Sequence, residues 1–316
     1  MSNEEEKQLV KIAEMYYLEN KTQSQISKEL DIHRSTISRL LKLSREMGIV
    51  NITIDRFAAG TASYEEALLN KFNNLIAVKV VPTVGSANNK QILEDLGKAA
   101  NNCLKEYIED DMVLGFSWGS AMSYFAKAVS GIDKNNLLCV PMVGGPSGRS
   151  KSEYHVNTIT FEVATNLSGK ALLIDAPAIP ETLELKKALM KSEFNQSLVK
   201  YWRQLDIAIM GIGSPTMKTS DRWNDFYGQD VFEWVKENEV AGDIVSRFYD
   251  ENGKHIASEL DDRLISIDLN DLSRAKYKIG IAESRNKAKA IKGALLGGYI
   301  NVLITSQETA QALLED

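Results

Sequence analysis

The first fifty residues show apolar positions at helical spacing, interrupted by polar corners. This spacing predicts an amphipathic helix over residues 4–19. A second helix over 23–30 can be capped by Thr22, and a third over 34–47 ends before Gly48. The apolar and aromatic side chains on one face of the first helix are Leu9, Val10, Ile12, Ala13, Tyr16 and Tyr17.

Beyond these helices the pattern changes. Alternating apolar and polar residues over 49–54 predict a short strand, and the small, polar residues 55–63 form a candidate linker. Apolar, strand-like runs then alternate with helical patterns, which predicts an α/β domain with a largely parallel sheet. The helical patterns cover 64–72, 91–107, 119–129 and 286–296. The strand candidates are 76–81, 112–116, 137–143, 171–174, 206–212, 243–249, 264–269, 277–282 and 301–305.

The patterns divide the chain into an N-terminal helical domain over residues 1–55, a linker over 56–63 and a larger α/β domain over 64–316. In the larger domain, glycines lie at the ends of several predicted strands. Ligands of open α/β sheets bind outside the carboxyl ends of the strands. We therefore expect a ligand site at these glycines, which are Gly115, Gly119, Gly144, Gly145, Gly211 and Gly213.

Composition narrows the class of protein. The 316 residues suit a small domain plus a larger one, and 44% hydrophobic with 25% charged residues is typical of globular proteins. The acidic start, MSNEEEKQLV, is not a signal peptide, and no apolar run approaches the roughly 20 residues of a membrane span. Cys103 and Cys139 lie in apolar segments, and with three histidines they form no zinc-ligand pattern. We expect a cytoplasmic protein without metal or cofactor.

The second and third predicted helices meet across a tight corner at Asp31 and Ile32, which is typical of a helix-turn-helix. In that motif the second helix enters the DNA major groove with its N-terminal turns. Arginine pairs with guanine, and serine or threonine contacts bases or phosphates. The candidate DNA contacts are therefore His33, Arg34, Ser35, Thr36, Ser38 and Arg39, preceded by Thr22 and Gln23.

Charge supports this interpretation locally. Six basic residues stand against two acidic ones between Lys21 and Arg45, a balance of +4 in a chain with net charge −6. Contacts of basic residues with phosphates supply affinity that does not depend on base sequence. Two helices at this spacing also occur as plain structural hairpins, so a helical protein-interaction module stays an alternative.

The string T-Q-x-x-I-x-x-x-L-x-I-x-R-x-T-I-S-R-L-L resembles the helix-turn-helix of the SorC family of sugar-responsive bacterial transcriptional regulators. The resemblance continues in order along the chain. It covers GFSWGSAM (115–122), VPMVGGPSGR (140–149), YHVNTIT (154–160), DIAIMGIGSP (206–215), AGDIVSRFYD (241–250) and INVLITSQETA (300–310). It implies a sugar-binding α/β domain related to glucosamine-6-phosphate deaminase and ribose-5-phosphate isomerase. It also implies operator DNA near sugar-catabolism promoters as a partner, and a homo-oligomer, expected to be a tetramer.

By this resemblance the first glycine-containing loops contact a sugar or sugar phosphate. Ser117, Gly119 and Ser120 would offer hydroxyl and backbone donors at a helix start; the alternative is a packed strand-to-helix turn. Gly144 and Gly145 precede Arg149, which either binds phosphate in a bidentate manner or is solvated. His155 and Asn157 either bind hydroxyls or cap a helix.

Further candidates follow later strands. Gly211 and Gly213 expose backbone amides, and Asp243 either accepts hydrogen bonds from sugar hydroxyls or caps a turn. Lys287 is a candidate phosphate partner, although Glu283-Ser284 stands where many family members carry two glycines.

Catalysis is not expected. Asp243, Glu283 and His155 could supply an acid and a base, but no fixed triad or metal set is visible. The remaining enzymatic alternative is a sugar-phosphate isomerase or deaminase with an attached DNA-binding head.

Overall fold

The computed structural model describes residues 3–50, 60–83, 89–146, 152–215, 227 and 229–315. Backbone contacts divide the chain into two compact units, Met1–Asp55 and Arg56–Asp316. The smaller unit contains α1 (Asn3–Tyr17), α2 (Gln23–Leu30) and α3 (Arg34–Glu46). Each predicted helix of this unit is confirmed, with ends that differ by at most two residues.

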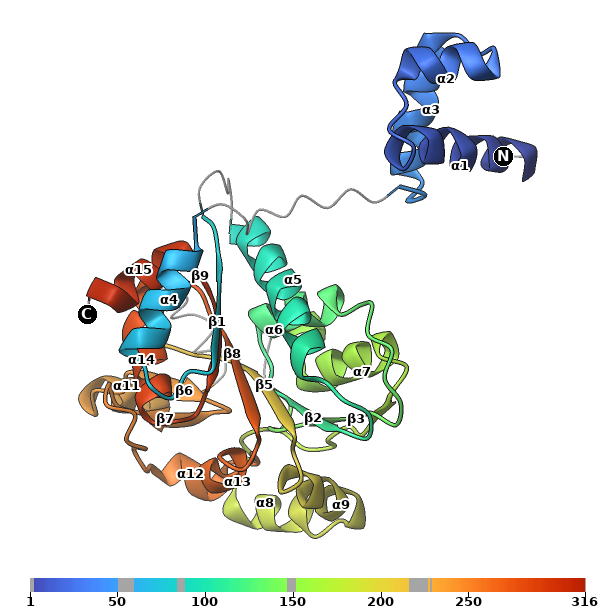
Figure 1. The fold of residues 1–316 in the computed structure, drawn as a ribbon. Coiled ribbons are helices and arrows are strands. Elements are labelled where there is room, and N and C mark those ends of the chain that lie inside the picture. Colours follow the sequence, from blue (N-terminus) through green and yellow to red (C-terminus); the bar gives the residue numbers. More distant parts are fainter. Residues whose placement is uncertain are drawn as a thin grey trace. The chain divides into compact units, whose positions relative to one another are not determined.

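The larger unit consists of strands and helices that alternate for most of its length (Figure 1). Its strands are β1 (Ala77–Val81), β2 (Val113–Phe116), β3 (Leu138–Pro141), β4 (Lys170–Ala171), β5 (Ile207–Gly211), β6 (Gly242–Ile244), β7 (Arg247–Tyr249), β8 (Tyr277–Ile281) and β9 (Val302–Ser306). Its α-helices are α4 (Ala62–Lys71), α5 (Asn89–Tyr107), α6 (Ser120–Ala128), α7 (Val156–Asn166), α8 (Leu183–Met190), α9 (Glu193–Trp202), α11 (Gln229–Glu237), α12 (Glu259–Arg263), α13 (Leu269–Leu272), α14 (Ala288–Leu296) and α15 (Gln307–Glu315). Two 3₁₀ turns are η2 (Ser152–Tyr154) and η3 (Arg285–Lys287).

Local capping explains the turn between the helices of the smaller unit. At the start of α2, the Gln25 backbone N–H donates to Thr22 Oγ1 at 3.3 Å, and the Thr22 N–H donates to Gln25 Oε1 at 2.8 Å. These reciprocal bonds satisfy two donors that the helix leaves free. At its end, Asp31 adopts a left-handed backbone, φ 51°, which aspartate tolerates better than most residues. The three helices close over a core of Ile12, Met15, Ile26, Ile37 and Leu41.

A seven-stranded parallel sheet, ordered β1-β9-β8-β5-β2-β3-β4, organises the larger unit. Successive strand side chains point to opposite faces, so helices on both sides bury both faces. Helices α5, α6 and α7 cover one face and pack on residues such as Leu114, Ile207 and Ile279. Helices α4, α9, α14 and α15 cover the other and pack on Ala208 and Leu303 (Figure 1). The predicted α/β class with a parallel sheet is confirmed.

The strand order reverses between β2 and β5. From β2 the chain builds outward through β3 and β4, whereas from β5 it builds the opposite way through β8 and β9. The loops that leave the carboxyl ends of β2 and β5 therefore diverge. Open parallel sheets bind ligands at such a switch point.

Three predicted strands differ from the structure. Residues 243–249 form the antiparallel pair β6 and β7, because Val245 and Ser246, with φ of 47° and 67°, reverse the chain. Residues 264–269 make one isolated bridge, Val143 to Ser266, and stay outside the sheet. The candidate 171–174 contributes only the second residue of β4.

The boundary between the predicted domains is only partly visible. Most of the predicted strand 49–54, and residues 56–59 of the predicted linker, lie outside the described residues. Helix α4 begins at Ala62, inside the predicted linker.

Candidate functional site

The carboxyl edge of the central strands brings together five of the predicted effector residues. The Gly211 N–H at the end of β5 donates to Ser117 Oγ, just beyond β2, at 3.1 Å. Gly213 and Asp243 exchange backbone N–H···O bonds of 3.0 and 3.2 Å. Lys287 Nζ, beyond β8, donates to the Ile212 carbonyl at 2.6 Å. Loops after β2, β5 and β8 and the start of the β6–β7 hairpin thus meet at the switch point.

Asp243 is the buried acid of this cluster, with 8% of its surface exposed. Its Oδ2 accepts hydrogen bonds of 3.2 Å from the Tyr227 hydroxyl and from the Ser246 backbone N–H. Within the described residues its Oδ1 accepts none. Burial raises the pKa of Asp243 to about 6, while the two hydrogen bonds and the charge of Lys287 act in the opposite direction.

The turn beside Asp243 is strained. Val245 has φ 47°, although its side chain is β-branched and 3% exposed. A non-glycine residue held in this region costs on the order of 1–3 kcal/mol. Asp243 Oδ2 holds the turn through the Ser246 N–H. One carboxylate oxygen therefore caps the turn, and the other accepts no hydrogen bond from a described residue.

Helix α6 begins at the same edge without a side-chain cap. Gly119 precedes it with φ 125°, a conformation that side chains rarely adopt. A Cβ built at Gly119 meets nothing within 4 Å, so there is open space in front of this loop. The Gly119 N–H itself donates to the Tyr154 carbonyl at 3.1 Å. The first turn of α6, including the half-buried Ser120, can therefore receive an anion.

The Gly144-Gly145 pair has a packing role. A Cβ at Gly144 would lie 2.5 Å from the Pro177 carbonyl, and one at Gly145 would lie 2.4 Å from His155 Nε2. The glycines thus let the chain approach its own backbone and the imidazole. His155 Nδ1 accepts the Asn157 N–H at 3.1 Å and caps α7, which leaves the ring proton on Nε2. Burial lowers the pKa of His155 and favours this neutral form.

The predicted effector residue Asn157 has a structural role. Asn157 uses both ends of its amide on one residue: its Nδ2 donates to the Ile174 carbonyl, and its Oδ1 accepts the Ile174 N–H, each at 3.0 Å. These contacts tie α7 to the segment after β4. Arg149 lies outside the described residues.

Tyr227 contacts Asp243, and Glu283 lies close enough to Lys287 to feel its charge. Tyr227 was not among the predicted site residues, because it lies 16 positions before Asp243 and no local pattern links the two. Burial raises the pKa of Glu283, and the charge of Lys287 opposes that shift. The described residues hold no group of three or more potential metal ligands.

In the smaller unit, α3 presents one polar face. Ser35, Ser38, Arg39 and Lys42 are spaced at i, i+3, i+4 and i+7, so they share the side opposite the buried Ile37. The predicted contacts Arg34 and Thr36 lie on opposite flanks of this face.

Other predicted DNA contacts are used within the unit. Thr22 caps α2. His33 caps α3: its Nδ1 lies 2.8 Å from Ser35 Oγ and accepts the Ser35 N–H at 3.4 Å. Gln23 is half-buried beside Arg34.

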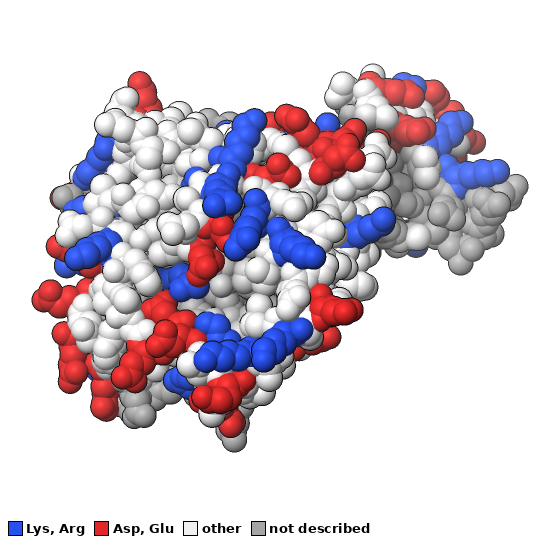
Figure 2. All heavy atoms as spheres, turned by 90° about the horizontal axis from the view of Figure 1, so that it is seen from below, with Lys and Arg blue, Asp and Glu red and all other residues white. Residues whose placement is uncertain are grey.

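The charge on the larger unit is mixed. On the face seen from below, Lys and Arg side chains are interspersed with Asp and Glu (Figure 2). A duplex needs a continuous basic surface, so this face is unsuited to DNA. No helix in the described part of the chain is long and apolar enough to cross a membrane.

Comparison with known proteins relates both units to one family. A family model described as "Putative sugar-binding domain" matches residues 57–315. The sorbitol operon regulator of Klebsiella pneumoniae is 39% identical over 308 residues, 97% of each chain. The crystal structure of full-length SorC from the same organism superposes with a TM-score of 0.87 at 38% identity, covering 98% of each chain.

The chain belongs to the SorC family of transcriptional regulators. A more distant relative, the deoxyribonucleoside regulator of Bacillus subtilis (strain 168), is 28% identical over 323 residues and covers both chains completely. These relatives are named as regulators, which supports the expectation of a regulator and not an enzyme.

The backbone of Ser284, at φ 122°, has a conformation that favours glycine. The resemblance placed two glycines at Glu283-Ser284 in many family members. Glycine adopts this conformation freely. The loop after β8 therefore has a backbone conformation typical of glycine, although serine occupies the position.

We expect Ser284→Gly to raise the free energy of unfolding by about 1 kcal/mol. Relief of strain, on the order of 1–3 kcal/mol, exceeds the extra unfolded-state entropy of glycine, about 0.5–1 kcal/mol. Urea denaturation measures the difference. The matched control is Ser273→Gly, at φ −62°, which should lower stability. Equal losses in both variants would contradict strain at Ser284.

Asp243 should make the free energy of unfolding depend on pH. Its pKa rises on folding from 3.8 to about 6, so the folded state binds the proton more tightly. Its contribution is therefore most favourable below pH 4 and declines by about 3 kcal/mol as pH rises through 6. The unfolding free energies of the wild type and of an Asp243→Asn variant are measured from pH 4 to 7. The difference between the two isolates this change. A pH-independent difference would contradict the raised pKa.

Proposed function

We propose that this chain is a DNA-binding regulator of a sugar-catabolism operon, controlled by a sugar or sugar phosphate at the carboxyl edge of its sheet. The observation that carries the proposal is the meeting of Ser117, Gly211, Asp243 and Lys287 at the switch point, in a chain that also has a separate helix-turn-helix. The similarity to the sorbitol operon regulator favours a hexitol or a related ketose as the sugar.

Different residues of the proposed effector site bind different chemical groups of the ligand. Oδ1 of Asp243 accepts a hydrogen bond from a sugar hydroxyl, since Oδ2 already accepts hydrogen bonds from Tyr227 and Ser246. Lys287 and the start of α6 bind a phosphate or the polar end of the ligand. Arg149 is retained in the proposal as a second phosphate partner.

Control requires that the effector bind the DNA-competent and DNA-incompetent states unequally, because a ligand with equal affinity for both shifts nothing. In the proposed mechanism the larger units assemble a homo-oligomer, a tetramer, in the cytoplasm. The ligand changes the arrangement of the subunits and thereby the spacing of the DNA-reading helices relative to operator half-sites.

The first test is a gel-shift titration with DNA from upstream of the gene's own operon. The full chain should bind it, more weakly as salt rises, and sorbitol or its phosphate monoester should change that binding. Asp243→Asn should bind DNA like the wild type but respond less to the sugar. Ser273→Gly serves as the control for a change elsewhere in the unit. A normal response in Asp243→Asn would remove Asp243 from the site.

The second test concerns the reading face of α3. If Arg39 pairs with a base, Arg39→Ala should cost about 1–3 kcal/mol of operator affinity and reduce the preference over a scrambled duplex. Fluorescence anisotropy with both duplexes measures the two effects. Arg203→Ala, on the larger unit, should change neither. Equal loss on both duplexes would show that Arg39 contacts the backbone and not a base.

A further inference from the structure

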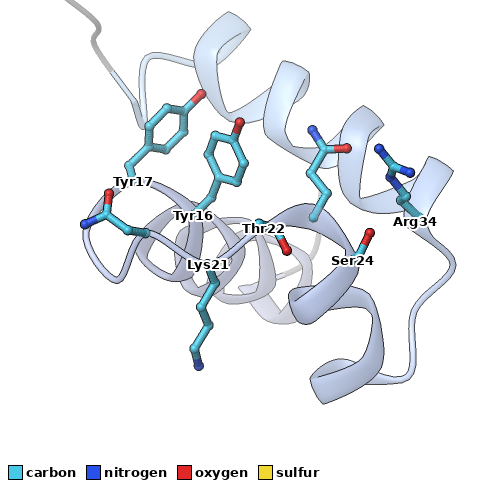
Figure 3. Close-up of a pocket in the computed structure, with 8 residues that line it drawn as sticks. Tyr16, Tyr17, Lys21, Thr22, Ser24 and Arg34 are labelled. Carbon is cyan, nitrogen blue, oxygen red and sulfur yellow. The ribbon is translucent and has the colours of Figure 1, made fainter.

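A polar hollow of about 550 Å³ opens where the end of α1 meets the starts of α2 and α3 (Figure 3). Every lining side chain can form hydrogen bonds, and none is acidic. An anion therefore suits this hollow better than a cation. The lining residues are Tyr16, Tyr17, Asn20, Lys21, Thr22, Gln23, Ser24 and Arg34.

The two tyrosines offer hydroxyls that form no hydrogen bond with another described residue of this unit. Their rings pack on the core of the unit and meet edge to face, with centroids 4.9 Å apart. Their hydroxyls point out of that core, toward the same side (Figure 3). Among the residues described in this unit, neither hydroxyl forms a hydrogen bond. Phenylalanine would give the same packing, so folding does not account for the hydroxyls.

Arg34 supplies the charge. Its guanidinium extends on the side of the tyrosine hydroxyls (Figure 3), and it forms no ion pair with a described residue. Lys21 points away from them, and its Nζ lies 2.9 Å from Glu19 and 2.7 Å from Glu29. The hollow thus combines one uncompensated positive charge with neutral donors. This matches a phosphodiester, which carries a single negative charge.

We propose that this hollow binds a backbone phosphate of duplex DNA, with Tyr16 and Tyr17 as neutral donors and Arg34 as the cation. The inference rests on the proposed function, that this unit binds DNA. Arg34 lies on the flank of α3 turned toward α1, while Ser35, Ser38 and Arg39 form the exposed face. Arg34 therefore positions the helix on the backbone, in place of the base contact that its sequence position suggested.

The experiment uses the full chain and measures anisotropy with an operator duplex and a scrambled duplex over a range of salt concentrations. The double variant Tyr16→Phe, Tyr17→Phe should weaken binding to both duplexes by the same factor, about 10-fold or more, for lost hydrogen bonds to a charged group. The salt dependence should not change, because no charge is removed. The thermal unfolding midpoint should match the wild type, because no hydrogen bond within the protein is lost.

Variants of Arg34 and Lys21 test which of the two positive charges contributes to phosphate binding. Arg34→Gln should also weaken both duplexes equally and reduce the slope of log affinity against log salt by about one. Lys21→Gln, at the lysine held by two glutamates, should leave this slope unchanged.

Three results would overturn the assignment. Wild-type affinity of the double tyrosine variant would mean that the hydroxyls face solvent. Loss of operator preference in Arg34→Gln, with scrambled-duplex affinity intact, would place Arg34 on a base. In both cases the wild type still binds DNA, so the proposed function survives. If the wild type binds neither duplex, the proposed function itself fails, and the phosphate site fails with it.

Discussion

The divergence of the chain at β2 and β5 is the constraint on which the larger unit depends. Parallel strands bury both faces, so each connection must cross to a helix, and only where the strand order reverses do neighbouring loops leave in opposite directions. The hydrogen bond from the Gly211 N–H to Ser117 Oγ spans that point. It uses a hydroxyl that the family resemblance assigned to a ligand, so Ser117 has a structural role in the proposed site.

Asp243 shows how one group that stabilises the structure would also serve the proposed ligand. Burying a carboxylate is unfavourable unless it is hydrogen-bonded, and the raised pKa expresses that cost. Oδ2 accepts hydrogen bonds from Tyr227 and from the Ser246 N–H in the strained turn, and these bonds offset part of that cost. A ligand hydroxyl at Oδ1 would recover more. The bound state would then be stabilised by completing an unsatisfied group, which gives the effector a physical reason to favour one arrangement of this hairpin.

The features that the sequence predicts best are those that local interactions determine. Thr22, Gln25 and Gly48 mark helix ends through neighbouring backbone groups, so the helix-turn-helix was predicted nearly to the residue. The hairpin at 243–249 was missed because Val-Ser is a poor signal for a left-handed turn, and tertiary packing imposes it. Asn157 was assigned to the effector because its amide suits sugar hydroxyls. Its actual partner, Ile174, is 17 positions away and no periodicity reveals it.

The smaller unit also limits how regulation can work. The exposed polar face of α3 consists of four side chains, and in the proposed mechanism the polar hollow beside it would add affinity that is the same for every DNA sequence. A single unit of this size discriminates weakly, so operator choice in the proposed mechanism depends on several units bound at once. Their combined affinity falls sharply when their spacing no longer matches the half-sites. In the proposed mechanism the effector therefore needs no contact with the DNA-reading helix, because a modest change in how the larger units pair would change the affinity for the operator.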